Sequence, residues 1–193
     1  MKRMCVFCAS SKGAQPTYVS RAAELGRLLA GQGYELVYGG GNIGLMGVIA
    51  DACLAAGGRV IGVIPKALMD KELGHTGIQD LRIVDSMHTR KALMAELSDG
   101  FIALPGGFGT LEEFAEILTW GQLGIHRKPC GLLNVAGFYD HLLKFLDHAV
   151  AEKLLKAKHR ALIVEDQSPA TLLEKMARTH PTLEEKWIDR GQT

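Results

Sequence analysis

The feature that most constrains this chain is a regular alternation of short apolar runs with longer segments of helical period. The short runs have the length and composition of buried strands, and the longer segments repeat apolar residues every three or four positions. We expect strands near residues 3–9, 34–38, 59–64, 80–85, 100–105, 129–134 and 161–165. We expect helices near residues 16–31, 43–56, 87–98, 111–123, 139–153 and 169–179. This alternation predicts an α/β fold: a doubly wound, Rossmann-like, mostly parallel sheet of about seven strands with helices on both faces.

The alternation covers nearly the whole chain. At 193 residues the protein is long enough for one substantial core and short for two. No repeat, linker or low-complexity segment interrupts the pattern, so we expect a single Rossmann-like domain over residues 1–180. Residues 181–193 are polar and are expected to form a C-terminal tail. Doubly wound sheets bind ligands at the carboxyl ends of their strands, where the strand order reverses, and a site is expected there.

Charge and hydropathy exclude several kinds of partner. The formal net charge of +1 gives no field that would favour a nucleic acid polymer or an anionic membrane. No run approaches the roughly 18 apolar residues that span a bilayer, and the first apolar run, of about six residues, is shorter than that of a signal peptide. Cys5 and Cys8 have metal-like spacing, but no second Cys or His pair completes a metal site. We therefore predict no metal, and core thiols in a reducing, cytoplasmic compartment.

A first glycine-rich turn follows the second expected strand. Gly39, Gly41 and Gly44 match the dinucleotide-binding pattern G-x-G-x-x-G. That pattern also needs an acidic residue about twenty positions later, and the corresponding stretch here has none, which disfavours a nicotinamide cofactor. We expect the backbone at Gly40, Gly41 and Gly44 to approach a ligand closely.

A second glycine-rich turn is the stronger candidate for an anion site. Gly106, Gly107 and Gly109 follow the fifth expected strand and precede a helix, so backbone N–H groups and the positive end of the helix converge there. A phosphate is the natural ligand, although the G-K-[ST] sequence of a P-loop is missing. The alternative is a simple capped turn, because Thr110 and Glu113 also fit a T-x-x-E capping box.

The charges near this turn conflict with helix electrostatics. Glu112 and Glu113 lie where a bound phosphate would repel them, so nearby cations must offset the repulsion. Arg90 and Lys91 follow Ser86, a predicted N-cap, and cations at a helix start oppose the macrodipole by roughly 0.3–1 kcal/mol each. Their position is explained if they face a phosphate or the acids of the turn, and the alternative is a solvated helix face.

Taken together, these segments resemble the LONELY GUY family of cytokinin-activating phosphoribohydrolases. The resemblance runs from about Cys5 to Asp166. It is carried by Gly39–Gly47, Met87–Lys91, Pro105–Glu113, Thr119-Trp120 and Gln122–Ile125.

The resemblance implies hydrolysis of an N-glycosidic bond without a cofactor, giving a free base and ribose 5-phosphate. It makes Arg90 and Glu113 the catalytic pair and implies a homodimer. It surrounds the nucleotide with Glu72, Arg90, Lys91, Gly107, Phe108, Gly109, Thr110, Leu111, Glu112, Glu113 and Thr119. Proteins with this loop are often labelled lysine decarboxylases, but no lysine here has the setting of a pyridoxal phosphate Schiff base.

We hypothesise that the turn from Gly106 to Thr110 anchors the 5′-phosphate of a purine nucleotide. Glu113 would then activate water or stabilise the cationic sugar, and Arg90 would orient Glu113. Glu72 would accept a hydrogen bond from the base or the ribose. The motifs do not fix the base, so AMP and N6-substituted nucleotides are both candidates. The main rival is a carrier or sensor that binds a nucleotide without catalysis.

Overall fold

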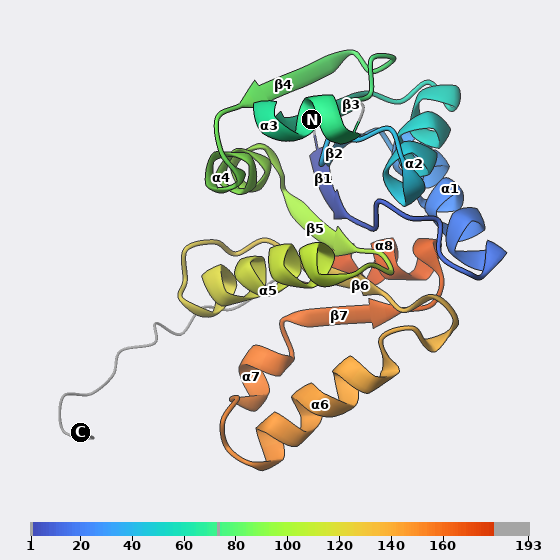
Figure 1. The fold of residues 1–193 in the computed structure, drawn as a ribbon. Helices are drawn as coiled ribbons and strands as arrows, with labels where there is room; N and C mark the ends of the chain where they lie inside the picture. The colour runs from blue at the N-terminus through green and yellow to red at the C-terminus, as the bar shows by residue number, and fades with distance from the viewer. Residues whose placement is uncertain (1, 73, 180–193) are drawn as a thin grey trace.

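Seven parallel strands form a single sheet in the computed structural model, which describes residues 2–72 and 74–179 (Figure 1). Their order across the sheet is β4-β3-β2-β1-β5-β6-β7. The strands are β1 (Lys2–Phe7), β2 (Tyr34–Tyr38), β3 (Val60–Pro65), β4 (Asp80–Val84), β5 (Gly100–Ala103), β6 (Cys130–Leu133) and β7 (Ile163–Asp166). Every neighbouring pair is parallel, so the predicted Rossmann-like class is confirmed. The expected tail, residues 181–193, lies outside the described residues.

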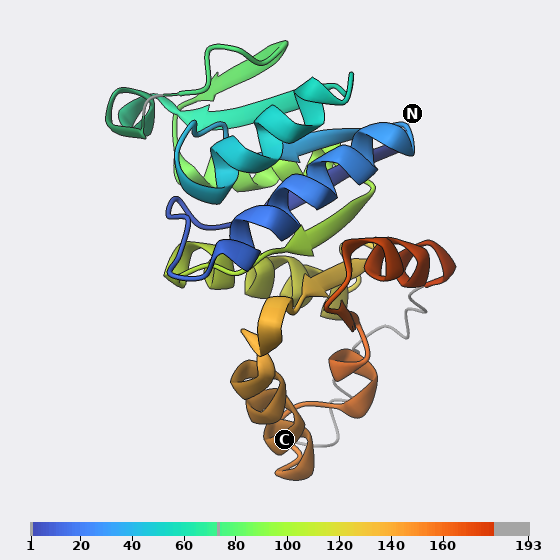
Figure 2. The ribbon, with the colours of Figure 1, turned by 90° about the vertical axis from the view of Figure 1, so that its right-hand side faces the viewer.

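Helices cover both faces of this sheet. One face carries α1 (Pro16–Gly31), α2 (Gly44–Ala55) and α8 (Pro169–Arg178), and Figure 2 shows α1 and α2 lying side by side across it. The other face carries α4 (Met87–Leu97), α5 (Phe108–Gln122) and part of α6 (Asp140–Ala151). Three short helices complete the fold: α3 (Lys66–Glu72), η1 (Val135–Gly137) and α7 (Ala157–Arg160).

The core has two layers because side chains alternate along each buried strand. Met4 and Val6 of β1 pack under α1 and α2, whereas Cys5 and Phe7 pack under α4 and α5. Cys8 belongs to the first layer, so Cys5 and Cys8 lie on opposite faces, as their spacing predicts. Cys5, Cys8, Cys53 and Cys130 are all buried and free.

The helix signals of the sequence explain most of the observed boundaries. Pro16 begins α1, and Ser86 and Ser168 are the N-caps of α4 and α8, each accepting a hydrogen bond from a backbone N–H. Gly33 and Gly57 follow helices with positive φ angles of 75° and 78°, a conformation that suits glycine. The sequence did not predict α3 and α7, which have 7 and 4 residues and are too short to show a helical period.

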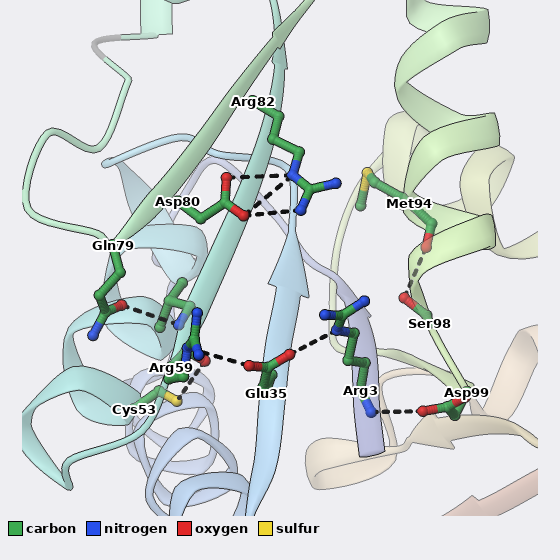
Figure 3. Close-up of polar contacts among 11 residues, drawn as sticks. Arg3, Glu35, Cys53, Arg59, Gln79, Asp80, Arg82, Met94, Ser98 and Asp99 are labelled. Atoms are coloured by element: carbon green, nitrogen blue, oxygen red, sulfur yellow. Dashed lines mark hydrogen bonds and ion pairs between the residues drawn. The ribbon is translucent and has the colours of Figure 1, made fainter. Parts of the chain in front are cut away.

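A network of charged groups ties together the amino ends of the central strands (Figure 3). Glu35 of β2 is buried, and its carboxylate accepts a 2.6 Å hydrogen bond from Arg3 Nε and lies 3.2 Å from Arg59 Nε. The backbone N–H of Arg3 donates to Asp99 Oδ2 at 2.8 Å, which adds the segment before β5. This network stabilises the edge of the sheet opposite the carboxyl ends.

Candidate active site

A cavity of about 440 Å³ opens at the carboxyl ends of β1 and β5. The chain runs outward from β1 through β2 and β3 to β4, then returns to place β5 on the other side of β1. The strand order therefore reverses between β1 and β5, which is where doubly wound folds bind ligands. The cavity is lined by Cys8, Ala9, Ser10, Ser11, Met46, Leu68, Met87, Arg90, Gly107, Phe108, Gly109, Thr110, Glu112 and Glu113.

The amino end of α5 forms one wall of this cavity. The helix begins at Phe108 with Gly107 as its N-cap, three residues earlier than the sequence predicts. The capping-box alternative is therefore wrong, because Thr110 lies inside the helix and the N-cap makes no side-chain hydrogen bond. The first hydrogen bond of the helix runs from Leu111 N to Gly107 O, which leaves the N–H groups before it available for an anion. A side chain at Gly106 would collide with the Thr110 hydroxyl, so this turn needs glycine for close packing.

Arg90 reaches the cavity from α4. Its Nη2 donates a 3.1 Å hydrogen bond to Gly39 O and lies 3.9 Å from Glu113 Oε1 on α5. Both side chains are largely buried, with exposed fractions of 8% and 10%. Arg90 Nε has no hydrogen-bond partner within the described part of the chain. The two residues that the resemblance makes catalytic are thus paired in the structure.

The first glycine-rich turn, which begins at Gly39, packs against Arg90 and fixes its position. A side chain at Gly39 would overlap the guanidinium of Arg90, so the turn leaves the space that Arg90 occupies. Gly44, with a φ of 64°, packs so closely on the backbone of Ser10 that a side chain would collide there too. Gly40 packs against β3 and Gly41 bridges to Gly74, and neither lines the cavity.

Lys91 lies next to Arg90 but does not line the cavity. Its Nζ contacts Glu112 Oε1 and lies 3.1 Å from Glu116 Oε2, so it links α4 to α5. The hydrogen bonds that Lys91 donates to Glu112 and Glu116, that to Glu112 having the largest effect, outweigh burial and raise the pKa of Lys91. The sequence predicted that these cations face either a phosphate or the acids of the turn, and Lys91 faces the acids.

The remaining predicted residues lie outside the cavity or outside the described side chains. Leu111 packs, half-buried, against the second core layer. Thr119 is exposed and donates to Ala115 O at 2.8 Å; it lies six residues beyond Glu113, which is about 9 Å along a helix. Glu72 is the last residue of α3, and its side chain lies outside the described part of the structure.

The sequence did not predict that the residues directly after β1 line the cavity. Cys8, Ala9, Ser10 and Ser11 line the cavity, but they form no recognisable motif. Their position directly after the first buried strand is the signal that would have found them. Burial, and then the nearby Glu113 carboxylate, raise the pKa of the Cys8 thiol far above its usual range, so this wall carries a neutral thiol.

Known proteins are similar in sequence to this chain over most of its length. A family model described as "Possible lysine decarboxylase" matches residues 46–176. The cytokinin riboside 5′-monophosphate phosphoribohydrolase LOG of Oryza sativa subsp. japonica is 49% identical over 95% of this chain and 76% of its own. The chain belongs to the LONELY GUY (LOG) family. A cytokinin riboside 5′-monophosphate phosphoribohydrolase of Arabidopsis thaliana is 52% identical over 91% of this chain and 82% of its own.

Solved structures with the same fold are more distant in sequence. The molybdenum cofactor carrier protein of Chlamydomonas reinhardtii has a TM-score of 0.69 at 21% identity, covering 92% of this chain and 99% of its own. The molybdenum cofactor binding protein of Rippkaea orientalis has a TM-score of 0.68 at 24% identity, with coverages of 92% and 96%. At these identities the two proteins share the fold of this chain, and the comparison shows the fold alone.

Two further features bear on the class of protein. None of the helices in the described ranges is long and apolar enough to cross a membrane. Among the described residues, no group of three or more His, Cys, Asp and Glu side chains is placed to hold a metal ion.

Proposed function

We propose that this LOG-family protein hydrolyses the N-glycosidic bond of purine nucleoside 5′-monophosphates to a free base and ribose 5-phosphate. The observation that carries the proposal is the buried Arg90–Glu113 pair, 3.9 Å apart, in the cavity at the reversal point of the sheet. The relatives named as phosphoribohydrolases match this chain at about half of all positions, 49% and 52%.

The 5′-phosphate is assigned to the amino end of α5. Gly107, Phe108, Gly109 and Thr110 line the cavity there, and the backbone N–H groups of the first helical turn point out of the helix end. Binding energy from this non-reacting group holds the anomeric carbon at a fixed distance from the catalytic pair.

Glu113 is assigned to the reacting carbon. Cleavage develops positive charge on the ribose, so a carboxylate there either stabilises the oxocarbenium-like centre or takes a proton from the attacking water. Arg90 holds Glu113 in place while its second anchor, Gly39 O, fixes the guanidinium to the sheet. The Nε of Arg90, for which no described residue is a hydrogen-bond partner, is a further donor for the phosphate or the departing base.

The base is assigned to the apolar part of the cavity, formed by Met46, Leu68, Met87 and Phe108. Phe108 is 94% exposed and Met87 39% exposed, which leaves apolar surface free to cover a purine. Neither the motifs nor these apolar side chains fix the group carried at N6, so AMP and N6-isopentenyl-AMP are both proposed substrates.

The protein is further proposed to act as a cytoplasmic homodimer. Leu123 and Ile125, directly after α5, are 53% and 66% exposed, and Thr119 on the same helix is also exposed. A second copy packed on this surface would cover the apolar side chains. Free, buried thiols fit a reducing compartment. Light scattering of the purified protein measures the dimer directly.

Two other functions fit the site less well. A Schiff-base enzyme such as a lysine decarboxylase needs a lysine at the reacting centre, and none of the described residues that line the cavity is a lysine. A carrier that binds its ligand unchanged is compatible with the fold, which a molybdenum cofactor carrier protein shares. A carrier, however, gives no reason for a buried arginine–glutamate pair in the cavity.

The test is product analysis by chromatography. AMP and N6-isopentenyl-AMP are incubated with the purified protein, beside the corresponding nucleosides without phosphate. Free base and ribose 5-phosphate from the nucleotides support the proposal, and the ratio of the two rates measures the effect of the N6 group. Intact nucleotides that stay bound to the protein would instead support the carrier.

A further inference from the structure

Two consecutive cations of α4 face acids of α5. Arg90 pairs with Glu113, whereas Lys91 contacts Glu112 and lies 3.1 Å from Glu116. The side chain of Lys91 is only 10% exposed, so both of these contacts form in a largely buried setting. Arg90 and Glu113 line the cavity, whereas Lys91 and Glu116 lie beside it and Glu112 lines its edge.

The acids held by Lys91 lie where they oppose the proposed ligand. Glu112 lines the cavity and is 54% exposed, and it belongs to the same end of α5 that is assigned to the 5′-phosphate. Glu116 follows one turn later and is 28% exposed. The carboxylates of Glu112 and Glu116 repel a phosphate dianion bound at this end of α5. The buried ammonium of Lys91, which contacts both, offsets part of that repulsion.

We propose that Lys91 is a positioning residue that neutralises Glu112 and Glu116 and thereby permits the 5′-phosphate to bind at Gly107–Thr110. This inference rests on the proposed function, because it needs the phosphate at the amino end of α5. Lys91 does not line the cavity, so it acts on the phosphate through the two acids rather than by contact.

The test measures the binding of ribose 5-phosphate by isothermal titration calorimetry, because this compound carries the phosphate and is not hydrolysed. In Lys91→Met the charge is lost and the length is kept, and we expect the Kd to rise on the order of tenfold, the effect of one uncompensated charge near a dianion. In Lys91→Met combined with Glu112→Gln the extra charge is removed, and the Kd should return to within about threefold of wild type.

The variant that combines Lys91→Met with Glu112→Gln distinguishes an electrostatic role of Lys91 from a direct contact with the phosphate. If Lys91 instead touched the phosphate or only held the two helices together, removing Glu112 would not restore binding, and a persistently weak double variant would overturn the inference. Glu112→Gln alone keeps Lys91 and changes an exposed residue, and it should tighten binding severalfold. Unchanged or weaker binding in that variant overturns the inference even if Lys91→Met does not fold.

Kinetics with AMP give a second readout. Lys91→Met should raise the KM for AMP and leave kcat within about twofold, because the catalytic pair is untouched. Lys175→Met, which removes an ion pair with Asp166 on α8 and β7, is the matched control and should leave both constants unchanged. A wild-type protein that binds ribose 5-phosphate but leaves AMP intact would contradict the proposed function alone. A wild-type protein that hydrolyses AMP but does not bind ribose 5-phosphate would overturn the inference alone.

Discussion

Gly39 has no side chain because Arg90 occupies the space that one would fill. The guanidinium lies against this residue, donates to its carbonyl oxygen at 3.1 Å and reaches Glu113 from there. The pattern G-x-G-x-x-G in this turn therefore has a packing explanation that requires no dinucleotide. Gly39, the residue directly after β2, thus sets the position of the Arg90 guanidinium on α4.

Gly39→Ala should displace Arg90 and lower kcat about 10²-fold, since misplacement of a catalytic group by about 1 Å has effects of that size. Steady-state kinetics with AMP measure the loss, and circular dichroism checks that the fold is retained. Gly31→Ala in α1 is the matched control, because nothing lies within 4 Å of the added methyl group. Full activity in Gly39→Ala would mean that Arg90 does not need its observed position.

At the scale of the elements, much of the fold was predictable from the sequence. The bounds of α1 agree because Pro16 and Gly31–Gly33 mark both ends with local chemistry. The predicted start of α5 is three residues late, because Gly107 and Gly109 indicate a turn, whereas Gly107 is the N-cap and Gly109 lies inside the helix. Glu35 was not predicted either, because nothing local distinguishes a buried acid paired across strands from an exposed one.

The Glu35 network should contribute to the stability of β1, β2 and β3. Glu35→Gln removes the charge that Arg3 and Arg59 share, and we expect the free energy of unfolding to fall by about 1–3 kcal/mol. Urea unfolding measures the change. Glu24→Gln, which breaks a more exposed ion pair with Arg21 within α1, should cost less than about 0.5 kcal/mol. Equal losses in the two variants would contradict a special role for the buried network.

The segment between α5 and β6 should make stability depend on pH. Burial lowers the pKa of His126 from its ordinary value of 6.5, and nearby Lys128 adds to the effect. The ring lies 2.8 Å from Ile117 O through Nε2, and its Nδ1 accepts from Lys128 N, which requires the neutral form. The unfolded chain therefore binds a proton more readily than the folded one, and stability falls as pH drops below about 6.5. Urea unfolding at pH 7.5 and pH 5.0 should show a smaller loss in His126→Gln than in wild type, and equal losses would contradict this.

At the scale of the whole molecule, the site exists because the chain crosses from β4 at one edge of the sheet back to β5 at its centre. Helix α4 makes this crossing and α5 follows β5, so Arg90 and Glu113 meet across two separate connections. The strand and helix alternation predicts a site at the carboxyl ends of the strands, where their order reverses, but it does not predict which strands flank that point. The distance between the two side chains depends on how α4 and α5 pack together, and no local pattern carries that information. The same holds for Ser10 and Ser11, which line the cavity without any motif.

Under the proposed function, Glu113 acts on the ribose and is not only a structural residue of α5. Glu113→Gln tests it most directly, because the amide keeps the size of the side chain and Gly107 already caps the helix. Turnover of AMP should fall about 10²–10⁴-fold, with ribose 5-phosphate binding close to that of wild type and the fold retained by circular dichroism. Near-normal turnover in Glu113→Gln would contradict the account.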